Sequence, residues 1–232
     1  MSKITRQKMQ KKIQRNKLTK PYLIGITGSL GTGKSLVGKI LKKLGICVID
    51  TDEIVRKLLS HKNKITKKII NEFGEKVSAP NGSINKRCLS SIVFKNKIKL
   101  KKLESIIHPE VNKKLESFLK LNKNKKIIAV LVPLLFECNL QRFYDETWCV
   151  VCNKKTQFKR LKNKGYKLQE ALLRIKSQYP GTKKQKLANF VINNSNTPLI
   201  TKKQVVKRLM SLGQLVRNRH HSFYKGHLFY LL

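Results

Sequence analysis

The distribution of apolar residues along the chain predicts alternating strands and helices. Continuous apolar runs are typical of strands buried on both faces of a parallel sheet, and they occupy residues 22–27, 46–50, 126–133, 147–152 and 190–193. Apolar residues at helical spacing predict helices at 36–44, 53–59, 62–73, 84–94, 98–107, 110–121, 155–164, 168–178 and 202–215. This alternation favours an α/β fold, with a five-stranded parallel sheet flanked by helices.

The segment between the second and third predicted strands is mostly helical and longer than a plain crossover. We therefore expect residues 60–121 to form an inserted helical subdomain. His108-Pro109 is expected to break a helix there, because proline suits the first turn of a new one. Two short basic helices within about residues 155–185 favour a lid. The expected layout is a basic N-terminal tail, one domain and a C-terminal tail, at 1–20, 21–212 and 213–232.

Residues 28–35, GSLGTGKS, fit the phosphate-binding pattern G-x-x-x-x-G-K-[ST] and lie between a predicted strand and a predicted helix. Glycines let successive N–H groups turn toward phosphate oxygens, and the helix N-terminus adds positive potential. Lys34 is expected to reach the β- and γ-phosphates, and the Ser35 hydroxyl to bind Mg²⁺. The alternative is a glycine-rich turn that matches by chance. The expected phosphate-binding residues are Gly28, Leu30, Gly31, Thr32, Gly33, Lys34 and Ser35.

Acidic residues first occur at the end of the second predicted strand. None precedes Asp50, and then Asp50, Asp52 and Glu53 follow within four positions. Ligands of open α/β sheets bind at this edge, where a phosphoryl-transfer enzyme needs carboxylates for Mg²⁺ and for the acceptor hydroxyl. Alternatively, Asp52 caps the next helix. Glu137, at the end of the third predicted strand, is either a further such carboxylate or a loop charge.

The composition is strongly basic, with 52 Lys and Arg against 12 Asp and Glu, a formal net charge of +40. A basic surface attracts nucleic acid. However, 42 of the 52 basic residues are Lys, and Arg, which recognises phosphates and bases in bidentate fashion, is scarce. The lysines are dispersed along the chain. Because Lys has A/T-rich codons, an A+T-biased genome would enrich it without selection for binding. We therefore expect no specific nucleic-acid partner. Cationic residues of the lid either stabilise a transferring phosphoryl group or are plain surface charge.

The five cysteines, an odd number, favour a reducing cytoplasm without disulfides. Cys149 and Cys152 have the spacing of a metal or redox pair but lie in an apolar run, which favours buried thiols in a strand. No apolar run approaches the roughly 20 residues of a membrane span, so a soluble protein is expected. The pattern does not indicate an oligomeric state.

Residues 28–35 form the phosphate-binding loop, or P-loop. Beyond it, several stretches in colinear order resemble the dephospho-coenzyme A kinase family. These are residues 44–52 with Asp50-Thr51-Asp52, 87–94, 107–109 with His108-Pro109, 132–137 (VPLLFE), 157–161, 174–178 and 188–194. The P-loop is shared by many kinases, whereas the D-x-D, H-P and V-P-L-L-F-E stretches at these separations are specific to this family. The similarity runs from about residue 21 to 212.

This resemblance implies a P-loop kinase fold with an acceptor-binding helical subdomain and a lid. It implies transfer of the γ-phosphoryl group of ATP to the ribose 3′-hydroxyl of dephospho-CoA, with ATP and Mg²⁺ required. Asp52 matches the carboxylate that orients or deprotonates this hydroxyl, and Asp50 matches an acid that assists Mg²⁺. His108 falls in the acceptor subdomain, and Arg160 and Arg174 fall in the lid.

The chain also departs from the family pattern. Lys164-Gly165 replaces an Arg-Asp pair at the end of the first lid helix, and Lys lacks the planar fork of Arg. Asn189 and Asn193 stand where the family commonly has Asp. We therefore expect an active kinase, whose catalytic efficiency the sequence does not determine. The alternatives are a P-loop protein that binds nucleic acid and another nucleoside or nucleotide kinase.

Overall fold

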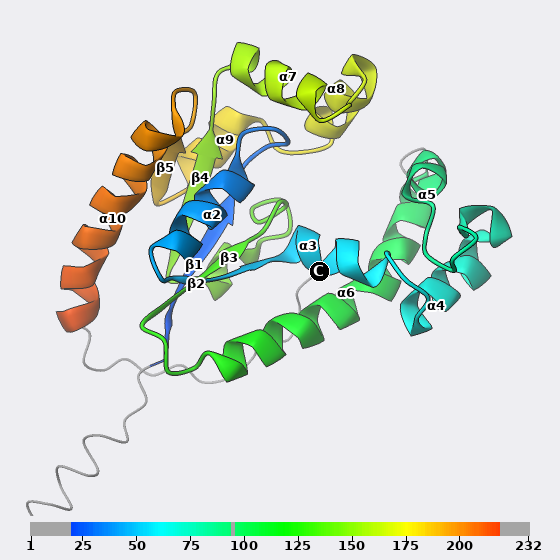
Figure 1. Cartoon of the computed structure of the whole chain (residues 1–232), viewed down its shortest axis with the longest axis horizontal. Helices are drawn as coiled ribbons and strands as arrows, with labels where there is room; N and C mark the ends of the chain where they lie inside the picture. Colours follow the sequence, from blue (N-terminus) through cyan, green and yellow to red (C-terminus); the bar gives the residue numbers. More distant parts are fainter. Residues whose placement is uncertain (1–19, 94–95, 219–232) are drawn as a thin grey trace, which may run out of the picture.

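The computed structural model describes residues 20–93 and 96–218, with side chains to residue 213. Residues 1–19 of the expected N-terminal tail, residues 94–95 and residues 219–232 of the expected C-terminal tail lie outside the described chain. Five strands form one parallel sheet in the order β2-β3-β1-β4-β5 (Figure 1). The strands are β1 (Tyr22–Thr27), β2 (Cys47–Asp50), β3 (Ile127–Leu131), β4 (Glu146–Val151) and β5 (Phe190–Asn193). The expected sheet is confirmed, although the sequence did not predict the strand order.

Both faces of the sheet are covered, as the continuous apolar strands predicted. On one face, α2 (Lys34–Lys43) and α10 (Pro198–Asn218) pack together, and Ala129 and Leu131 of β3 join their core. The alternate residues Ile128 and Val130 face the opposite core, which includes the segment after β3 with its short helix η2 (Leu140–Phe143). The three central strands are thus almost completely buried, whereas the edge strands β2 and β5 are only partly buried.

The helical subdomain has a core of its own, which shares no residue with the cores of the sheet. It consists of α4 (Lys64–Phe73), η1 (Glu75–Val77), α5 (Lys86–Val93) and the first part of α6 (Lys97–Leu121). The connection from the sheet is α3 (Thr51–Leu58), which packs on α6 and has no fully buried residue. In Figure 1 this unit stands to one side of the sheet.

The expected helix break at His108-Pro109 is wrong, because α6 runs continuously through Pro109. Proline inside a helix removes one hydrogen bond and costs about 3 kcal/mol. Burial of Ile107 and Val111 in the helical core, and of Leu115 against the sheet, offsets this cost. The row of buried apolar residues on both sides of Pro109 therefore keeps the helix continuous, although proline alone favours a break.

After β4 the chain forms α7 (Lys154–Asn163), α8 (Leu168–Lys176) and α9 (Gly181–Leu187). The first two match the expected lid helices and lie beyond the carboxyl edge of the sheet in Figure 1. The sequence pattern did not predict α9, which contacts β4. The last helix, α10, starts earlier than expected and runs to Asn218, so residues 213–218 of the expected tail are helical. No helix within the described residues is long and apolar enough to span a bilayer.

Candidate active site

The P-loop joins β1 to α2 at the centre of the sheet, as the motif predicted. Gly31 and Gly33 have φ angles of +82° and +103°, a region that favours glycine. Within the described chain, the N–H groups of Gly31, Gly33, Lys34 and Ser35 have no protein acceptor. Free N–H groups at the start of a helix form an anion-binding site. The loop is thus shaped to receive phosphate oxygens.

Side chains from distant parts of the chain hold the P-loop from outside. Gln157 Nε2 on α7 donates to Leu30 O at 2.6 Å, and Leu30 N donates to Gln178 Oε1 at 3.2 Å. Thr32 O accepts from Asn194 Nδ2 at 2.8 Å and from Arg160 Nη1 at 3.2 Å. Helix α7, the segment after α8 and the segment after β5 therefore bind the P-loop directly.

Two carboxylates and the P-loop lysine meet at the carboxyl edge of the sheet. Lys34 Nζ lies 3.7 Å from Asp52 Oδ2; the Lys34 side chain is 12% exposed and that of Asp52 is 65% exposed. Burial lowers the pKa of Lys34, although Asp52 and Asp50 oppose this shift. Burial, together with the charge of Asp52, raises the pKa of Asp50. Of the two carboxylates, that of Asp52 is therefore the more accessible to a substrate.

The start of α3 explains this arrangement. Asp50, not Asp52, caps the helix, because Asp50 Oδ1 accepts from Asp52 N at 3.0 Å. Thr51 Oγ1 donates to Leu131 O at 3.0 Å and fixes the helix start to the end of β3. The capping role expected as the alternative for Asp52 thus belongs to Asp50. The Asp52 side chain is left facing the P-loop lysine.

Glu137 forms a buried ion pair with Lys184, a residue that the sequence analysis did not single out. Lys184 Nζ lies 2.8 Å from Glu137 Oε1 and donates to Pro133 O at 2.9 Å. Glu137 Oε1 also accepts from Tyr179 N at 2.8 Å, whereas Glu137 Oε2 is buried without a partner in the described structure. Of the two interpretations of Glu137, this geometry favours neither a free loop charge nor an open metal ligand. It ties the segment after β3 to α9.

The remaining predicted residues lie on α6, α7 and α8. Arg174, on α8, lies 2.9 Å from Glu170 and stacks over Tyr166 at 5.4 Å from its ring centroid. His108 lies on α6, the helix on which α3 packs. Arg160 is the predicted lid residue that contacts the P-loop directly.

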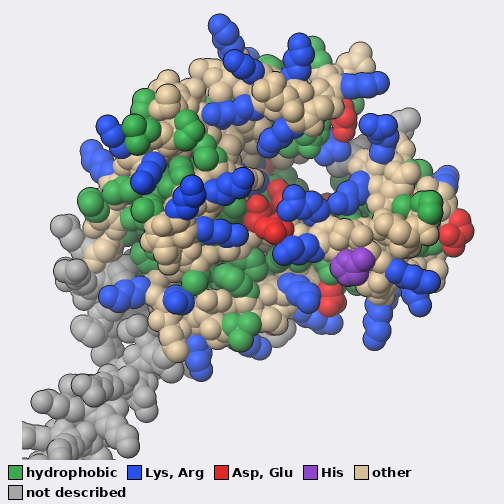
Figure 2. All heavy atoms as spheres, in the orientation of Figure 1, with side chains coloured by type: hydrophobic (Ala, Val, Ile, Leu, Met, Phe, Trp, Pro, Cys, Tyr) green, Lys and Arg blue, Asp and Glu red, His purple; other side chains and the backbone are tan. Residues whose placement is uncertain are grey.

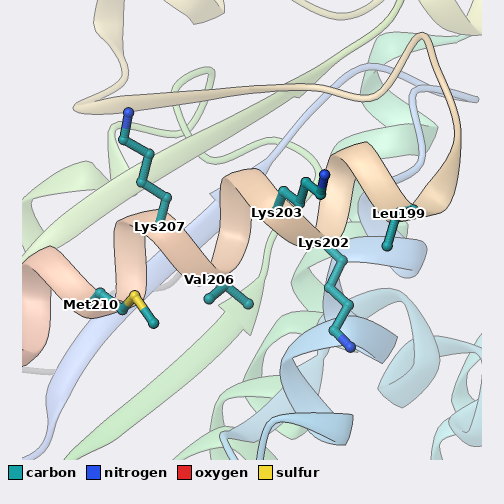
Figure 3. Close-up of a pocket in the computed structure, with 6 residues that line it drawn as sticks. All are labelled: Leu199, Lys202, Lys203, Val206, Lys207 and Met210. Carbon is teal, nitrogen blue, oxygen red and sulfur yellow. The ribbon is translucent and has the colours of Figure 1, made fainter.

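The face of the molecule seen in Figure 2 carries both acidic and basic side chains near the site. Figure 2 shows acidic side chains gathered beside a hollow between the sheet and the helical subdomain, with basic side chains around them. A separate hollow of about 310 Å³ lies on the outer face of α10 (Figure 3). It is lined by Leu199, Lys202, Lys203, Val206, Lys207 and Met210. None of these is acidic, so this hollow lacks the carboxylates that the sheet edge offers.

The cysteine pair is not part of the site. Cys149 is buried in β4, and burial raises its pKa to about 11. Cys152 follows the end of β4 and lies near Arg160, yet burial raises the pKa of its thiol too. In the described residues no group of three or more His, Cys, Asp or Glu is arranged to hold a metal ion. The expectation of buried thiols in a strand is confirmed for Cys149, whereas Cys152 is half-buried and lies just after the strand.

The sequence model of the family described as "Dephospho-CoA kinase" matches residues 22–199. A dephospho-CoA kinase of Carboxydothermus hydrogenoformans is 39% identical over 187 residues, which cover 79% of this chain and 91% of that protein. A solved structure from Thermus thermophilus matches with a TM-score of 0.70 at 27% identity, covering 84% of this chain and 98% of the other. Dephospho-CoA kinase from Campylobacter jejuni matches with a TM-score of 0.55 at 28% identity, covering 83% and 97%.

Proposed function

The chain belongs to the dephospho-CoA kinase family, and we propose that its sheet-edge site transfers the γ-phosphoryl group of ATP to the ribose 3′-hydroxyl of dephospho-CoA. The products are CoA and ADP, in the last step of CoA synthesis. The observation that supports this site is the approach of Lys34 Nζ to Asp52 Oδ2, 3.7 Å, beside a loop with free N–H groups.

Each residue has a distinct task in this proposal. The N–H groups of the P-loop bind the β- and γ-phosphates, and Lys34 neutralises charge that develops on them. Asp52 accepts a hydrogen bond from the 3′-hydroxyl and takes its proton as the new P–O bond forms and the bond to ADP breaks. Little covalent chemistry is needed, since phosphoryl transfer depends mainly on positioning and charge stabilisation.

The residues present also fit a magnesium ion. Mg²⁺ prefers oxygen ligands, takes few from the protein and otherwise uses phosphates and water. The exposed Ser35 hydroxyl at the start of α2 would bind it, and Asp50, whose charge acts on the neighbouring Lys34, would assist. When bound, Mg²⁺ neutralises the β- and γ-phosphates and aligns them.

The helical subdomain and the lid complete the proposed site. We assign the acceptor side to the subdomain that contains His108, and the donor side to the P-loop under the lid residues Arg160 and Arg174. Arg160 contacts the P-loop, whereas Arg174 is paired with Glu170 in the present structure, so binding of phosphate by Arg174 requires a change of partner. Reduced thiols and a soluble substrate favour a cytoplasmic enzyme.

The test is formation of ADP and CoA from ATP, Mg²⁺ and dephospho-CoA by the purified protein. Lys34→Ala and Asp52→Asn should each lower kcat by roughly 100-fold or more. Matched controls are Lys39→Ala, an exposed lysine on the same helix, and Glu53→Gln, the acid next to Asp52. Both controls should keep wild-type rates. Wild-type turnover no higher than that of Lys34→Ala would refute the proposal.

A further inference from the structure

Two carboxamide side chains bind carbonyl groups of the P-loop on the side away from its free N–H groups. Gln157 Nε2 donates to Leu30 O at 2.6 Å, and Asn194 Nδ2 donates to Thr32 O at 2.8 Å. Gln157 belongs to α7, which follows β4, and Asn194 follows β5, so both come from the β4–β5 side of the P-loop strand β1 (Figure 1). Gln157 is 9% exposed and Asn194 is fully buried. Neither contact is explained by the phosphoryl-transfer chemistry itself.

The geometry of the peptide bond links these contacts to phosphate binding. The Leu30 carbonyl and the Gly31 N–H belong to one peptide plane, and the Thr32 carbonyl and the Gly33 N–H belong to another. Both peptide bonds are trans, so carbonyl and N–H point in opposite directions. Fixing each carbonyl outward therefore fixes the following N–H inward, into the phosphate cradle.

Such a restraint matters because the second residue of each plane is glycine. Glycine allows a peptide plane to rotate among conformations closed to other residues. Gly31 has a φ angle of +82° and Gly33 one of +103°. As glycines, both can also adopt other φ angles. Without an outside partner for the carbonyl, the loop backbone alone does not determine where each N–H points.

Asn194 is itself oriented by a neighbour. Thr201 Oγ1 on α10 donates to Asn194 Oδ1 at 2.8 Å, and Thr201 is fully buried. The oxygen end of the carboxamide is thereby committed to Thr201, and its NH₂ end must face Thr32 O. Arg160 Nη1 reaches the same carbonyl at 3.2 Å. The orientation of the Thr32–Gly33 peptide thus depends on contacts that begin in the last helix.

We propose that Gln157 and Asn194 are positioning residues that aim the N–H groups of Gly31 and Gly33 at the phosphates of the nucleotide. This proposal rests on the proposed function, because it requires the P-loop to bind the triphosphate. It predicts a specific loss of phosphate affinity when either carboxamide is removed, with the acceptor side unaffected.

The test uses neutral substitutions of similar size, Gln157→Met and Asn194→Leu, so that no new charge repels the phosphates. Affinity is measured by calorimetry for ATP, for inorganic tripolyphosphate, which has no adenosine, and for dephospho-CoA. Each variant should bind ATP and tripolyphosphate roughly 10- to 100-fold more weakly, the effect of one misdirected charge-assisted hydrogen bond. Dephospho-CoA affinity, and its KM in the assay, should change less than twofold. Thr201→Val, which frees the Asn194 carboxamide, should weaken both phosphate ligands by a smaller factor.

The matched control is Gln204→Met. Gln204 holds the backbone of Asn193 with two hydrogen bonds, of 2.9 and 2.8 Å, next to Asn194 but not on the P-loop. It should bind tripolyphosphate within twofold of wild type. The positioning role would be overturned if Gln157→Met and Asn194→Leu bound tripolyphosphate as tightly as wild type. It would also be overturned if these variants lost affinity for dephospho-CoA to the same extent and had a lowered Tm. If the wild type bound neither ATP nor tripolyphosphate, the proposed function would fail as well.

Discussion

Replacing Lys184 by Met should destabilise the protein strongly, although Lys184 is one of 52 basic residues. The Lys184 side chain has no exposed surface, and its partner Glu137 is 12% exposed. Lys184 Nζ contacts Glu137 Oε1 at 2.8 Å and Pro133 O at 2.9 Å. Met fills a similar volume but donates no hydrogen bond, so within the described residues the variant leaves the Glu137 carboxylate with Tyr179 N as its remaining hydrogen-bond donor.

Breaking a buried ion pair by removal of one partner costs about 3–5 kcal/mol. For a chain of this size, about 2–4 °C of Tm corresponds to 1 kcal/mol, so the expected decrease in Tm is about 6–20 °C. The double variant Lys184→Met/Glu137→Gln should recover roughly half of this loss or more. Its neutral carboxamide needs no cation and can still accept from Tyr179 N.

Calorimetry at neutral pH and urea unfolding would measure these differences. Lys186→Met, an exposed lysine on the same helix, is the control and should stay within about 0.5 kcal/mol of wild type. The reasoning would be refuted by Lys184→Met unfolding within that same range. Equal stability of the single and double variants would show that the stranded charge is not the cause.

Two further predictions concern the P-loop and the acids beside it. Burial raises the pKa of Asp50, so the folded protein binds this proton more tightly than the unfolded chain, and ionised Asp50 opposes folding. Asp50→Asn keeps the helix cap and should raise Tm at pH 7. The difference in Tm from wild type should shrink as pH falls through the Asp50 pKa. A difference that grows in acid would contradict this. Gly33→Ala should abolish turnover and unfold at lower urea concentration than Gly45→Ala. Both glycines have positive φ, costing about 1–2 kcal/mol for alanine, but only at Gly33 would the added Cβ overlap Asn194 Nδ2.

The sequence predicted the elements that depend on local pattern. The apolar runs identified all five strands, and the P-loop was placed correctly because its spacing, strand and helix are contiguous. The break at Pro109 was wrong because a local signal was outweighed by burial of Ile107 and Val111, which only the tertiary structure reveals. Helix α9 was missed because four of its seven residues are lysine or glutamine, so it has no apolar periodicity from which a helix could be predicted.

The supporting contacts of the site were harder to predict. Gln157 and Asn194 fell within stretches of family resemblance, but their partners are 127 and 162 residues away along the chain. No pattern in one sequence pairs a carboxamide with a carbonyl at such a separation. Lys184 could not be distinguished from its many neighbours by composition, because burial alone makes it different.

The separate core of the helical subdomain has an evolutionary consequence. Ile69, Val77 and Leu89 pack among themselves and share no core residue with the sheet beneath the P-loop. Substitutions in this unit can accumulate without repacking the side chains that form the core beneath the P-loop. Under the proposed division of the site, selection can therefore change the shape offered to the phosphate acceptor while the P-loop and its supports are inherited unchanged.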